Sequence, residues 1–222
     1  MTPIRVEQVT KRYRRGSEVV TAVDRATFEL RPGTMTGLVG PSGSGKTTLL
    51  NLLLGGDDPD EGAVHGLPTQ ASWSLSAVVP QSLCLLDELT LAENVTLPVR
   101  LGATPRGSAQ ELMTELGIAG LADRAPAETS LGEQQRAAVA RALLTATGLL
   151  VVDEPTSHQD EANALRVVDA LAVHAAHGAT VVVATHDARV VERCDPVLQI
   201  RDGVVRPAEP GSSSRFEHSG GG

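Results

Sequence analysis

With 222 residues, 41% of them hydrophobic and 21% charged, the chain can bury one sizeable core, and its composition excludes global disorder, coiled coils and collagen. Nineteen lysines and arginines against 27 aspartates and glutamates give a formal net charge of -8, which argues against a broad electrostatic surface for nucleic acid. No apolar run reaches the roughly 18 residues that span a bilayer and the amino terminus carries no secretory signal, so we expect a cytosolic chain.

Short apolar runs rich in β-branched residues recur along the chain, each followed by turn residues and helical sequence. Strands are therefore predicted at 4–9, 35–39, 149–152 and 180–184, and helices at 48–54, 109–116, 133–144 and 160–177. Residues 149–152 and 181–183 are apolar without alternation, as in parallel strands covered on both faces. The order of these elements predicts an α/β fold with a mainly parallel sheet.

A local basic cluster, formed by Lys11, Arg12, Arg14 and Arg15, follows the first predicted strand. Two interpretations stay open for it. It is either a solvated turn or a site close to phosphates or lipid headgroups.

A complete phosphate-binding loop follows the strand at 35–39. The loop consists of Gly40, Pro41, Ser42, Gly43, Ser44, Gly45, Lys46 and Thr47, and Thr48 continues into the next predicted helix. In such a loop backbone N–H groups surround phosphate oxygens, the lysine reaches the β- and γ-phosphates and the hydroxyl of Thr47 binds Mg²⁺. Lys46 is one of two lysines beside 17 arginines, which favours a site that needs a compact point charge.

The two cysteines, Cys84 and Cys194, are too few for a disulfide framework. Their spacing does not match a metal site either. We therefore expect two buried free thiols without a chemical role.

Residues 87–147 contain helical patterns and no strand run comparable to the others. We interpret them as a helical subdomain inserted into an α/β core made of residues 1–86 and 148–206. The serines, prolines and glycines after Arg206 predict a flexible tail over residues 207–222.

An acidic pair, Asp153 and Glu154, ends the apolar strand at 149–152. Asp153 can hold Mg²⁺ through water, and Glu154 can orient or deprotonate an attacking water. Such a pair is otherwise often part of a helix cap, but a phosphate loop in the same chain favours catalysis. The loop and the pair do not by themselves distinguish kinases, GTPases and transport ATPases.

These motifs resemble the ATP-binding subunits of ABC transporters, in order and over nearly all of residues 4–206. The resemblance implies a P-loop NTPase core with a mainly parallel sheet, a small antiparallel β subdomain and an inserted helical subdomain. It implies that Tyr13 stacks on adenine and that Gln81 senses Mg²⁺ and the γ-phosphate. It also implies that His186, just after a buried strand, contacts the γ-phosphate.

Residues 129–136 look like the signature of that family, which in most members reads Leu-Ser-Gly-Gly-Gln or Leu-Ser-Gly-Gly-Glu. Ser130 and Gly132 match it and Glu133 follows, whereas Thr129 and Leu131 depart from it. In the family this helix start holds the γ-phosphate bound to the opposite subunit; without a ligand, the same feature is an ordinary helix cap.

Two further segments compare with the family. Residues 157–160 match the segment that crosses its dimer interface, although Gln159 replaces a usual apolar residue. Leu89 to Pro98 resembles the branch that serves lipoprotein-release, macrolide-efflux and cell-division permeases. Only 35 residues separate Lys46 from Gln81, which implies a shortened antiparallel sheet around residues 61–76.

The resemblance implies an ATPase that binds ATP and Mg²⁺, with Glu154, His186, Gln81 and Lys46 as catalytic residues and Thr47, Gln81 and Asp153 at the metal. Its expected partners are a second copy or a homologous ATPase subunit and an integral membrane permease at the inner face of the cell membrane, with no nucleic acid. One alternative is a regulatory, mechanotransmitting ATPase that controls a membrane protein without transport. A more distant alternative is a soluble ATPase of DNA repair or translation.

Overall fold

The structure, a computed structural model, describes residues 2–67, 76–145 and 148–208. Its strands are β1 (Ile4–Arg15), β2 (Glu18–Leu30), β3 (Met35–Val39), β4 (Glu61–His65), β5 (Ser76–Val79), β6 (Leu149–Asp153), β7 (Thr180–Ala184), β8 (Val197–Arg201) and β9 (Val204–Pro207). Its α-helices are α1 (Lys46–Leu53), α2 (Leu91–Arg100), α3 (Ala109–Glu115), α4 (Leu131–Thr145), α5 (Glu161–Ala176) and α6 (Ala188–Val191). Two short 3-10 helices, η1 (Ala119–Leu121) and η2 (Pro126–Glu128), connect α3 to α4.

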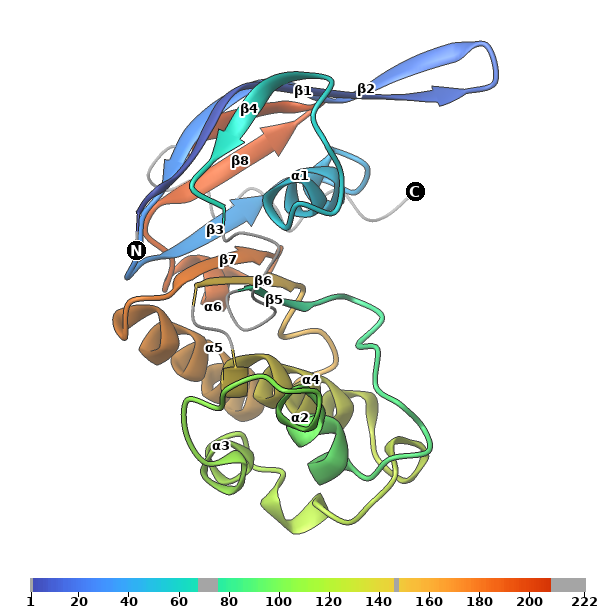
Figure 1. The fold of residues 1–222 in the computed structure, drawn as a ribbon, viewed down its shortest axis with the longest axis vertical. Coiled ribbons are helices and arrows are strands. Elements are labelled where there is room, and N and C mark those ends of the chain that lie inside the picture. The colour runs from blue at the N-terminus through green and yellow to red at the C-terminus, as the bar shows by residue number, and fades with distance from the viewer. Residues whose placement is uncertain (1, 68–75, 146–147, 209–222) are drawn as a thin grey trace.

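The strands form two sheets. The main sheet has the order β5-β6-β7-β3-β8-β9, in which β9 runs antiparallel to β8 and the other pairs are parallel. The smaller sheet, in the order β2-β1-β4, is antiparallel. In Figure 1 the antiparallel sheet lies at one end of the molecule, the main sheet in the middle and α2, α3 and α4 at the other end. The predicted α/β class and small antiparallel sheet are confirmed.

Two hydrophobic cores lie on opposite faces of the main sheet. Leu149 and Val151 of β6 pack with α1 and the antiparallel sheet, whereas Leu150 and Val152 pack with α2, α4 and α5. Successive side chains of a strand point to opposite faces, so a strand buried on both sides needs apolar residues throughout. The uninterrupted apolar run therefore gives a central strand, as predicted.

Helix α5 has the ends that the sequence predicts. Asp160 caps it by accepting a hydrogen bond from the backbone N–H of Asn163, at 2.8 Å. The helix ends at His177, and Gly178 follows with φ 97°, a left-handed conformation that glycine adopts without a steric penalty.

The amino-terminal strand differs from its prediction. β1 continues from residue 9 to Arg15 and forms a hairpin with β2, so it belongs to the antiparallel sheet and no helix follows it. The basic cluster therefore lies on a strand, and its interpretation as a turn is wrong. Lys11 pairs with Asp57 at 2.6 Å and Arg12 with Glu61 at 2.7 Å. These contacts, with the loop before β4 and with β4 itself, account for the two charges locally.

Strand β4 supplies the third strand of the antiparallel sheet by pairing with β1. The shortened sheet was expected around residues 61–76, of which residues 68–75 lie outside the described part of the chain. At the other end of the chain, Pro207 pairs with Leu198 and the N–H of Ala208 donates to Val197 O at 2.8 Å. The sheet thus extends past Arg206, and the rest of the expected tail, residues 209–222, is also outside the described part.

The two thiols differ. Cys194 is buried, and burial raises its pKa to about 12, so it is an unreactive thiol as expected. Cys84 is exposed, and the expectation of burial is wrong there. It lies in the connection after β5, where Leu83 and Cys84 both have positive φ and turn the chain.

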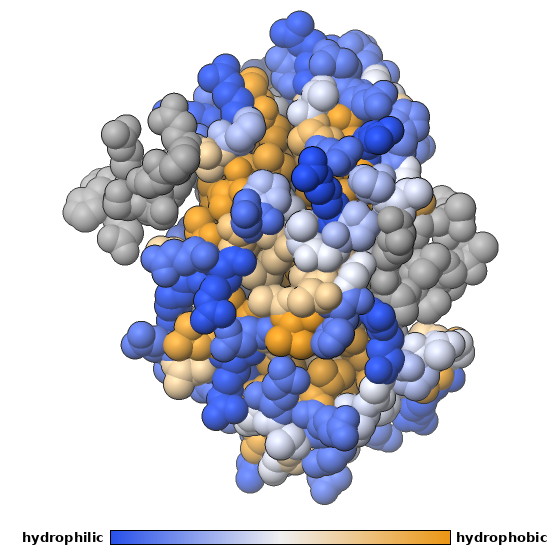
Figure 2. Space-filling model, turned by 90° about the vertical axis from the view of Figure 1, so that its left-hand side faces the viewer, coloured by the Kyte–Doolittle hydropathy of each residue, from blue (hydrophilic) through white to orange (hydrophobic). Residues whose placement is uncertain are grey.

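Figure 2 shows the face on the left of Figure 1, where polar side chains predominate at both ends of the molecule. Apolar residues reach the surface mainly at middle height, the level of the main sheet in Figure 1. Among the described residues, no helix has both the length and the apolar character needed to cross a membrane.

Candidate nucleotide site

The phosphate loop joins the carboxyl end of β3 to the start of α1. Two of its glycines, Gly40 and Gly45, are required by close backbone contacts. A Cβ on Gly40 would lie 2.2 Å from the carbonyl oxygen of Ile200, and one on Gly45, whose φ is 109°, would lie 2.1 Å from that of Ala22. The loop therefore lies against β8 on one side and β2 on the other, which fixes it where the helix begins.

Lys46 points back into this loop. Its ammonium donates hydrogen bonds to the carbonyl oxygens of Gly40 at 2.7 Å and Pro41 at 3.0 Å. The hydroxyl of Ser44 is buried and has no hydrogen-bond partner among the described residues. The ammonium of Lys46 thus lies against the loop backbone, where a bound anion can take over its hydrogen bonds.

Oxygen-bearing side chains meet beside the loop. A pocket of about 420 Å³ is lined by Thr47, Pro80, Gln81, Ser82 and Asp153. Thr47 lies beyond β3, Gln81 follows β5 and Asp153 ends β6. These strands are parallel members of one sheet, so their carboxyl ends lie at the same edge. The structure thereby brings together the three residues predicted at the metal.

Asp153 has an altered affinity for its proton. Burial raises its pKa, and the neighbouring charge of Glu154 raises it further, while Lys46 opposes the shift. The ionised form is therefore destabilised as long as no additional cation is near. A bound divalent cation would relieve that destabilisation.

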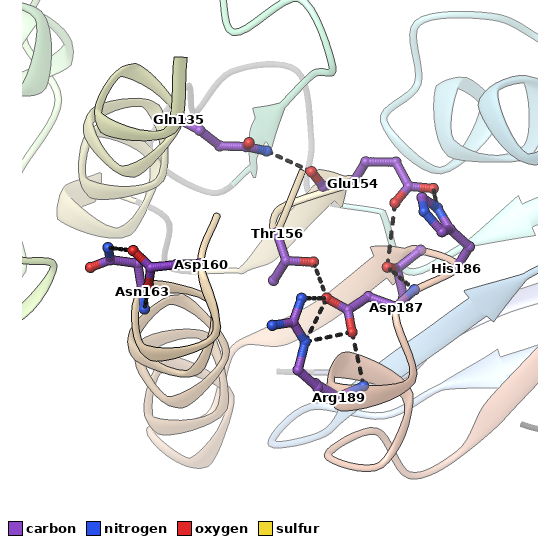
Figure 3. A network of polar contacts seen from close by, with 9 residues as sticks. Gln135, Glu154, Thr156, Asp160, Asn163, His186, Asp187 and Arg189 are labelled. Carbon is purple, nitrogen blue, oxygen red and sulfur yellow. Dashed lines mark hydrogen bonds and ion pairs between the residues drawn. The ribbon is translucent and has the colours of Figure 1, made fainter. Parts of the chain in front are cut away.

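Glu154 and His186 leave adjacent strands and meet (Figure 3). Nδ1 of His186 lies 2.9 Å from Oε1 of Glu154, and the hydroxyl of Thr185 donates to Oε2 at 3.4 Å. The side chain of Glu154 is 15% exposed and that of His186 is 78% exposed. The backbone N–H of Glu154 donates to Ala184 O at 2.8 Å, which holds the carboxylate at the sheet edge.

A polar network behind this pair escaped the sequence analysis. The hydroxyl of Thr156 donates to Asp187 at 2.7 Å, and Arg189 donates to both oxygens of the same carboxylate (Figure 3). Burial alone would raise the pKa of Asp187, but the hydrogen bonds from Arg189 and Thr156 outweigh it, and the pKa is lowered. The network joins the segment after Glu154 to the segment after His186. The sign of this network in the sequence was Asp187, a residue type that often caps a helix and that caps α6 here.

The signature residues form the first turn of α4. The N–H of Ser130 donates to the Glu133 carboxylate at 2.8 Å, and the N–H of Glu133 donates to the Ser130 hydroxyl at 3.3 Å. The bond from the Ser130 backbone is the main reason that the pKa of Glu133 is lowered. This is a capping box, so the local conformation needs no ligand to form.

The other two signature residues, Leu131 and Gly132, differ in their exposure and contacts. Leu131, which departs from the family pattern, is 54% exposed. A Cβ on Gly132 would lie 2.7 Å from the carbonyl oxygen of His158, so this glycine is needed for a close approach between α4 and the segment before α5. Neither Ser130 nor Gly132 lines the 420 Å³ pocket beside Lys46.

A second hollow, of about 480 Å³, lies between Gln81 and the start of α4. Its lining residues include Gln81, Leu131, Gln135, Glu154 and His158. Gln135 of α4 donates to the carbonyl oxygen of Glu154 (Figure 3). The helical end of the molecule therefore contacts the backbone of the acidic pair directly.

Tyr13 lies on the hairpin formed by β1 and β2 and is 39% exposed. Its hydroxyl donates to Asp57 at 2.9 Å, and the ammonium of Lys11 lies 5.5 Å from the ring centroid. Partial burial, followed by the bond to Asp57, raises the pKa of the phenol. The ring is thus held in place at the surface rather than in a core.

Comparisons with known proteins identify the family. The family described as "ABC transporter" matches residues 23–157. The lipoprotein-releasing system ATP-binding protein LolD of Granulibacter bethesdensis is 40% identical, covering 92% of this chain and 96% of its own length. The uncharacterized ABC transporter ATP-binding protein YbbA of Escherichia coli is 34% identical, covering 91% and 96%.

Two solved structures of the ABC transporter cassette MJ0796 resemble the fold. One, a dimer, has a TM-score of 0.83 and 30% identity, and the other, a dimer in a post-hydrolysis state with ADP and Pi, has a TM-score of 0.82 and 29% identity. Each match covers 93% of this chain and 98% of the other. The chain therefore belongs to the ABC transporter family, as an ATP-hydrolysing cassette.

Proposed function

We propose that this cassette closes on ATP as a dimer, with a second copy or a homologous ATPase subunit, and that opening after hydrolysis drives a separate membrane permease. The dimeric cassettes among the similar structures support this arrangement. The observation that carries the proposal is the meeting of Thr47, Gln81 and Asp153 in one pocket, directly followed in the chain by Glu154.

In this proposal the loop from Gly40 to Thr48 surrounds the phosphates, and Tyr13 stacks on adenine. Lys46 exchanges its two carbonyl partners for β- and γ-phosphate oxygens. Because the phosphates carry full negative charges, their hydrogen bonds to the ammonium are stronger than those of neutral carbonyls.

The pocket beside the loop suits Mg²⁺. Thr47, Gln81 and Asp153 offer a hydroxyl, an amide and a carboxylate, and Mg²⁺ prefers hard oxygen ligands with one or two carboxylates beside substrate phosphates. Burial already destabilises the ionised form of Asp153, which a cation would reverse. When bound, Mg²⁺ neutralises phosphate charge during transfer.

Glu154 is the proposed general base that takes a proton from the attacking water. Its partly buried carboxylate keeps a fixed orientation through Thr185 and His186. The exposed His186 ring reaches toward the γ-phosphate. Ser130, Gly132 and Glu133 complete the site of the opposite subunit, because a capped helix start presents backbone N–H groups to an anion.

The proposed permease contact is the 480 Å³ hollow beside Gln81 together with the helical subdomain of residues 87–147. Through that contact the cassette would be peripheral on the inner face of the cell membrane. The relatives named as lipoprotein-releasing system proteins favour a permease of that type.

The test uses a Glu154→Gln variant. It should bind ATP, form a particle of twice the chain's mass by light scattering, and release phosphate at least about 100-fold more slowly than the native chain. Glu192→Gln is the matched control, because Glu192 is exposed and outside the site. Native turnover in Glu154→Gln would contradict the proposal. A monomer with ATP bound would contradict a dimer of two copies and leave the homologous ATPase subunit as the partner.

A further inference from the structure

Gln159 joins two parts of the molecule that the sequence separates. It lies in the connection between β6 and α5, at a position where the family usually has an apolar residue. Its amide nitrogen donates to the carbonyl oxygen of Gly132 at 2.8 Å, and its amide oxygen accepts a hydrogen bond from Arg136. Both partners belong to α4.

Arg136 is a buried cation that depends on this contact. The residue is 6% exposed, and burial lowers its pKa. No ion pair within residues 2–67, 76–145 and 148–208 includes it, and its Nε has no hydrogen-bond partner there. Gln159 supplies the one hydrogen-bond acceptor that the guanidinium has in that part of the chain.

Beside Gln159, the backbone of α4 also lies close to the backbone of the connection between β6 and α5. A Cβ on Gly132 would lie 2.7 Å from His158 O and 3.4 Å from both polar atoms of the Gln159 amide. At the other end of the same connection, Gln135 donates to the carbonyl oxygen of Glu154. Helix α4 therefore bonds the connection at two places, five residues apart.

We propose that Gln159 is a positioning residue that holds the connection from Glu154 to Asp160 against the first turn of α4. The turn that carries Ser130 then keeps a fixed position relative to the catalytic carboxylate of its own chain. This rests on the function proposed above, in which Ser130 acts on ATP bound to the opposite subunit. An apolar residue at 159 cannot make either bond.

Two variants separate this role from a contribution to stability. Gln159→Leu removes both bonds. Gln159→Glu keeps a hydrogen-bond acceptor for Arg136, which becomes stronger because it is charged. It loses the N–H group that donates to Gly132 O and places a carboxylate oxygen against that carbonyl oxygen. Gln110→Leu, at an exposed position of α3, is the matched control.

The experiment measures melting temperature, ATP affinity of the monomer, and ATP-driven dimerisation in the Glu154→Gln background, with turnover measured in the native background. Both Gln159 variants should weaken dimerisation and lower kcat by about 10-fold, a barrier difference of about 1.4 kcal/mol. ATP affinity of the monomer should stay within about 2-fold, because the phosphate loop is unchanged. Gln159→Glu should keep the native melting temperature.

Native dimerisation and turnover in both variants would overturn the inference. A defect in Gln159→Leu alone, together with a lowered melting temperature, would also overturn it, because the effect would then follow only the buried charge of Arg136. Failure of the Glu154→Gln parent to dimerise would contradict the proposed dimer and the positioning role with it.

Discussion

At the residue scale, hydrogen-bonding partners explain why particular side chains occupy the site. Tyr13 is the sole tyrosine of the chain, and its ring is oriented by Asp57, which also pairs with Lys11. In the sequence, Lys11 stood out only as a member of the basic cluster, and Asp57 did not stand out at all. They lie 46 residues apart, and only the pairing of strands brings them together.

Substitutions at Tyr13 should separate stacking from orientation. Tyr13→Ala removes the aromatic surface and should raise the dissociation constant for ATP by about 10-fold, corresponding to the ~1–3 kcal/mol of base stacking. Tyr13→Phe keeps the ring but loses the bond to Asp57, so its effect should be smaller. Titration with a fluorescent ATP analogue measures both. Equal affinities for the two variants would contradict adenine stacking.

Leu131 tests whether a departure from the family signature matters. Its side chain is 54% exposed, and the capping box uses Ser130 and Glu133 instead. Leu131→Gly should therefore change the ATPase rate by less than about 10-fold, or about 1.4 kcal/mol. Ser130→Arg should abolish activity by filling the helix start. A large gain in Leu131→Gly, measured in the assembled transporter, would instead indicate a degenerate signature and a heterodimer with one impaired site.

At the scale of elements, the three parallel strands at the middle of the main sheet, β6, β7 and β3, were predictable, whereas only the first half of β1 was predicted among the antiparallel strands. β3 and β7 match their predicted bounds because both strands are buried throughout and neither contains a charged residue. β1 contains charged residues from Lys11 onward, where the sequence predicted no strand and left open a solvated turn or a site close to phosphates or lipid headgroups. Helix α2 was not among the predicted helices; it contains Pro98 and continues through it to Arg100.

The contact between α6 and the connection after β6 gives a pH-dependent prediction. The pKa of Asp187 is lowered in the folded chain, so its contribution to stability is present above its unfolded pKa and is lost as pH falls through the folded value. Asp187→Asn should lower the free energy of unfolding by about 1–2 kcal/mol at neutral pH. The difference from the native chain should shrink below roughly pH 4.

Urea unfolding of both proteins between neutral and acid pH measures that difference. Asp169→Asn is a suitable control, because its carboxylate pairs with Arg193 at an exposed position. A difference that grows toward acid pH would show that Asp187 does not stabilise the fold through its charge.

At the scale of the whole molecule, the sequence indicated the strand ends that build the pocket but not how the helices join them. The phosphate loop and the acidic pair each follow an apolar strand, so their meeting at one sheet edge follows from parallel topology. The hydrogen bonds donated by Gln135, Arg136 and Thr156 connect residues that are distant in sequence. No local pattern encodes such contacts, since they depend on how the packed layers face one another.

Nucleotide should stabilise the molecule as a whole. A ligand that binds only the folded chain adds stability in proportion to RT ln(1 + [L]/Kd), about 2.7 kcal/mol at 100-fold excess over Kd. ATP with Mg²⁺ should therefore raise the melting temperature, and ATP with EDTA should raise it less. Lys46→Ala should abolish both shifts. Persistence of the shift in that variant would indicate that ATP binds elsewhere.

The position of Lys46 inside the loop and of Lys11 beside Asp57 has a consequence for chemical labelling. These are the only lysines of the chain, and Lys11 lies 5.5 Å from the ring centroid of Tyr13. An amine-directed reagent therefore has two side-chain targets, both in the region assigned here to ATP. On most proteins such a reagent labels the surface broadly. Here the acylation of the two lysine side chains, read by mass spectrometry, measures how much of this single region is covered by a ligand.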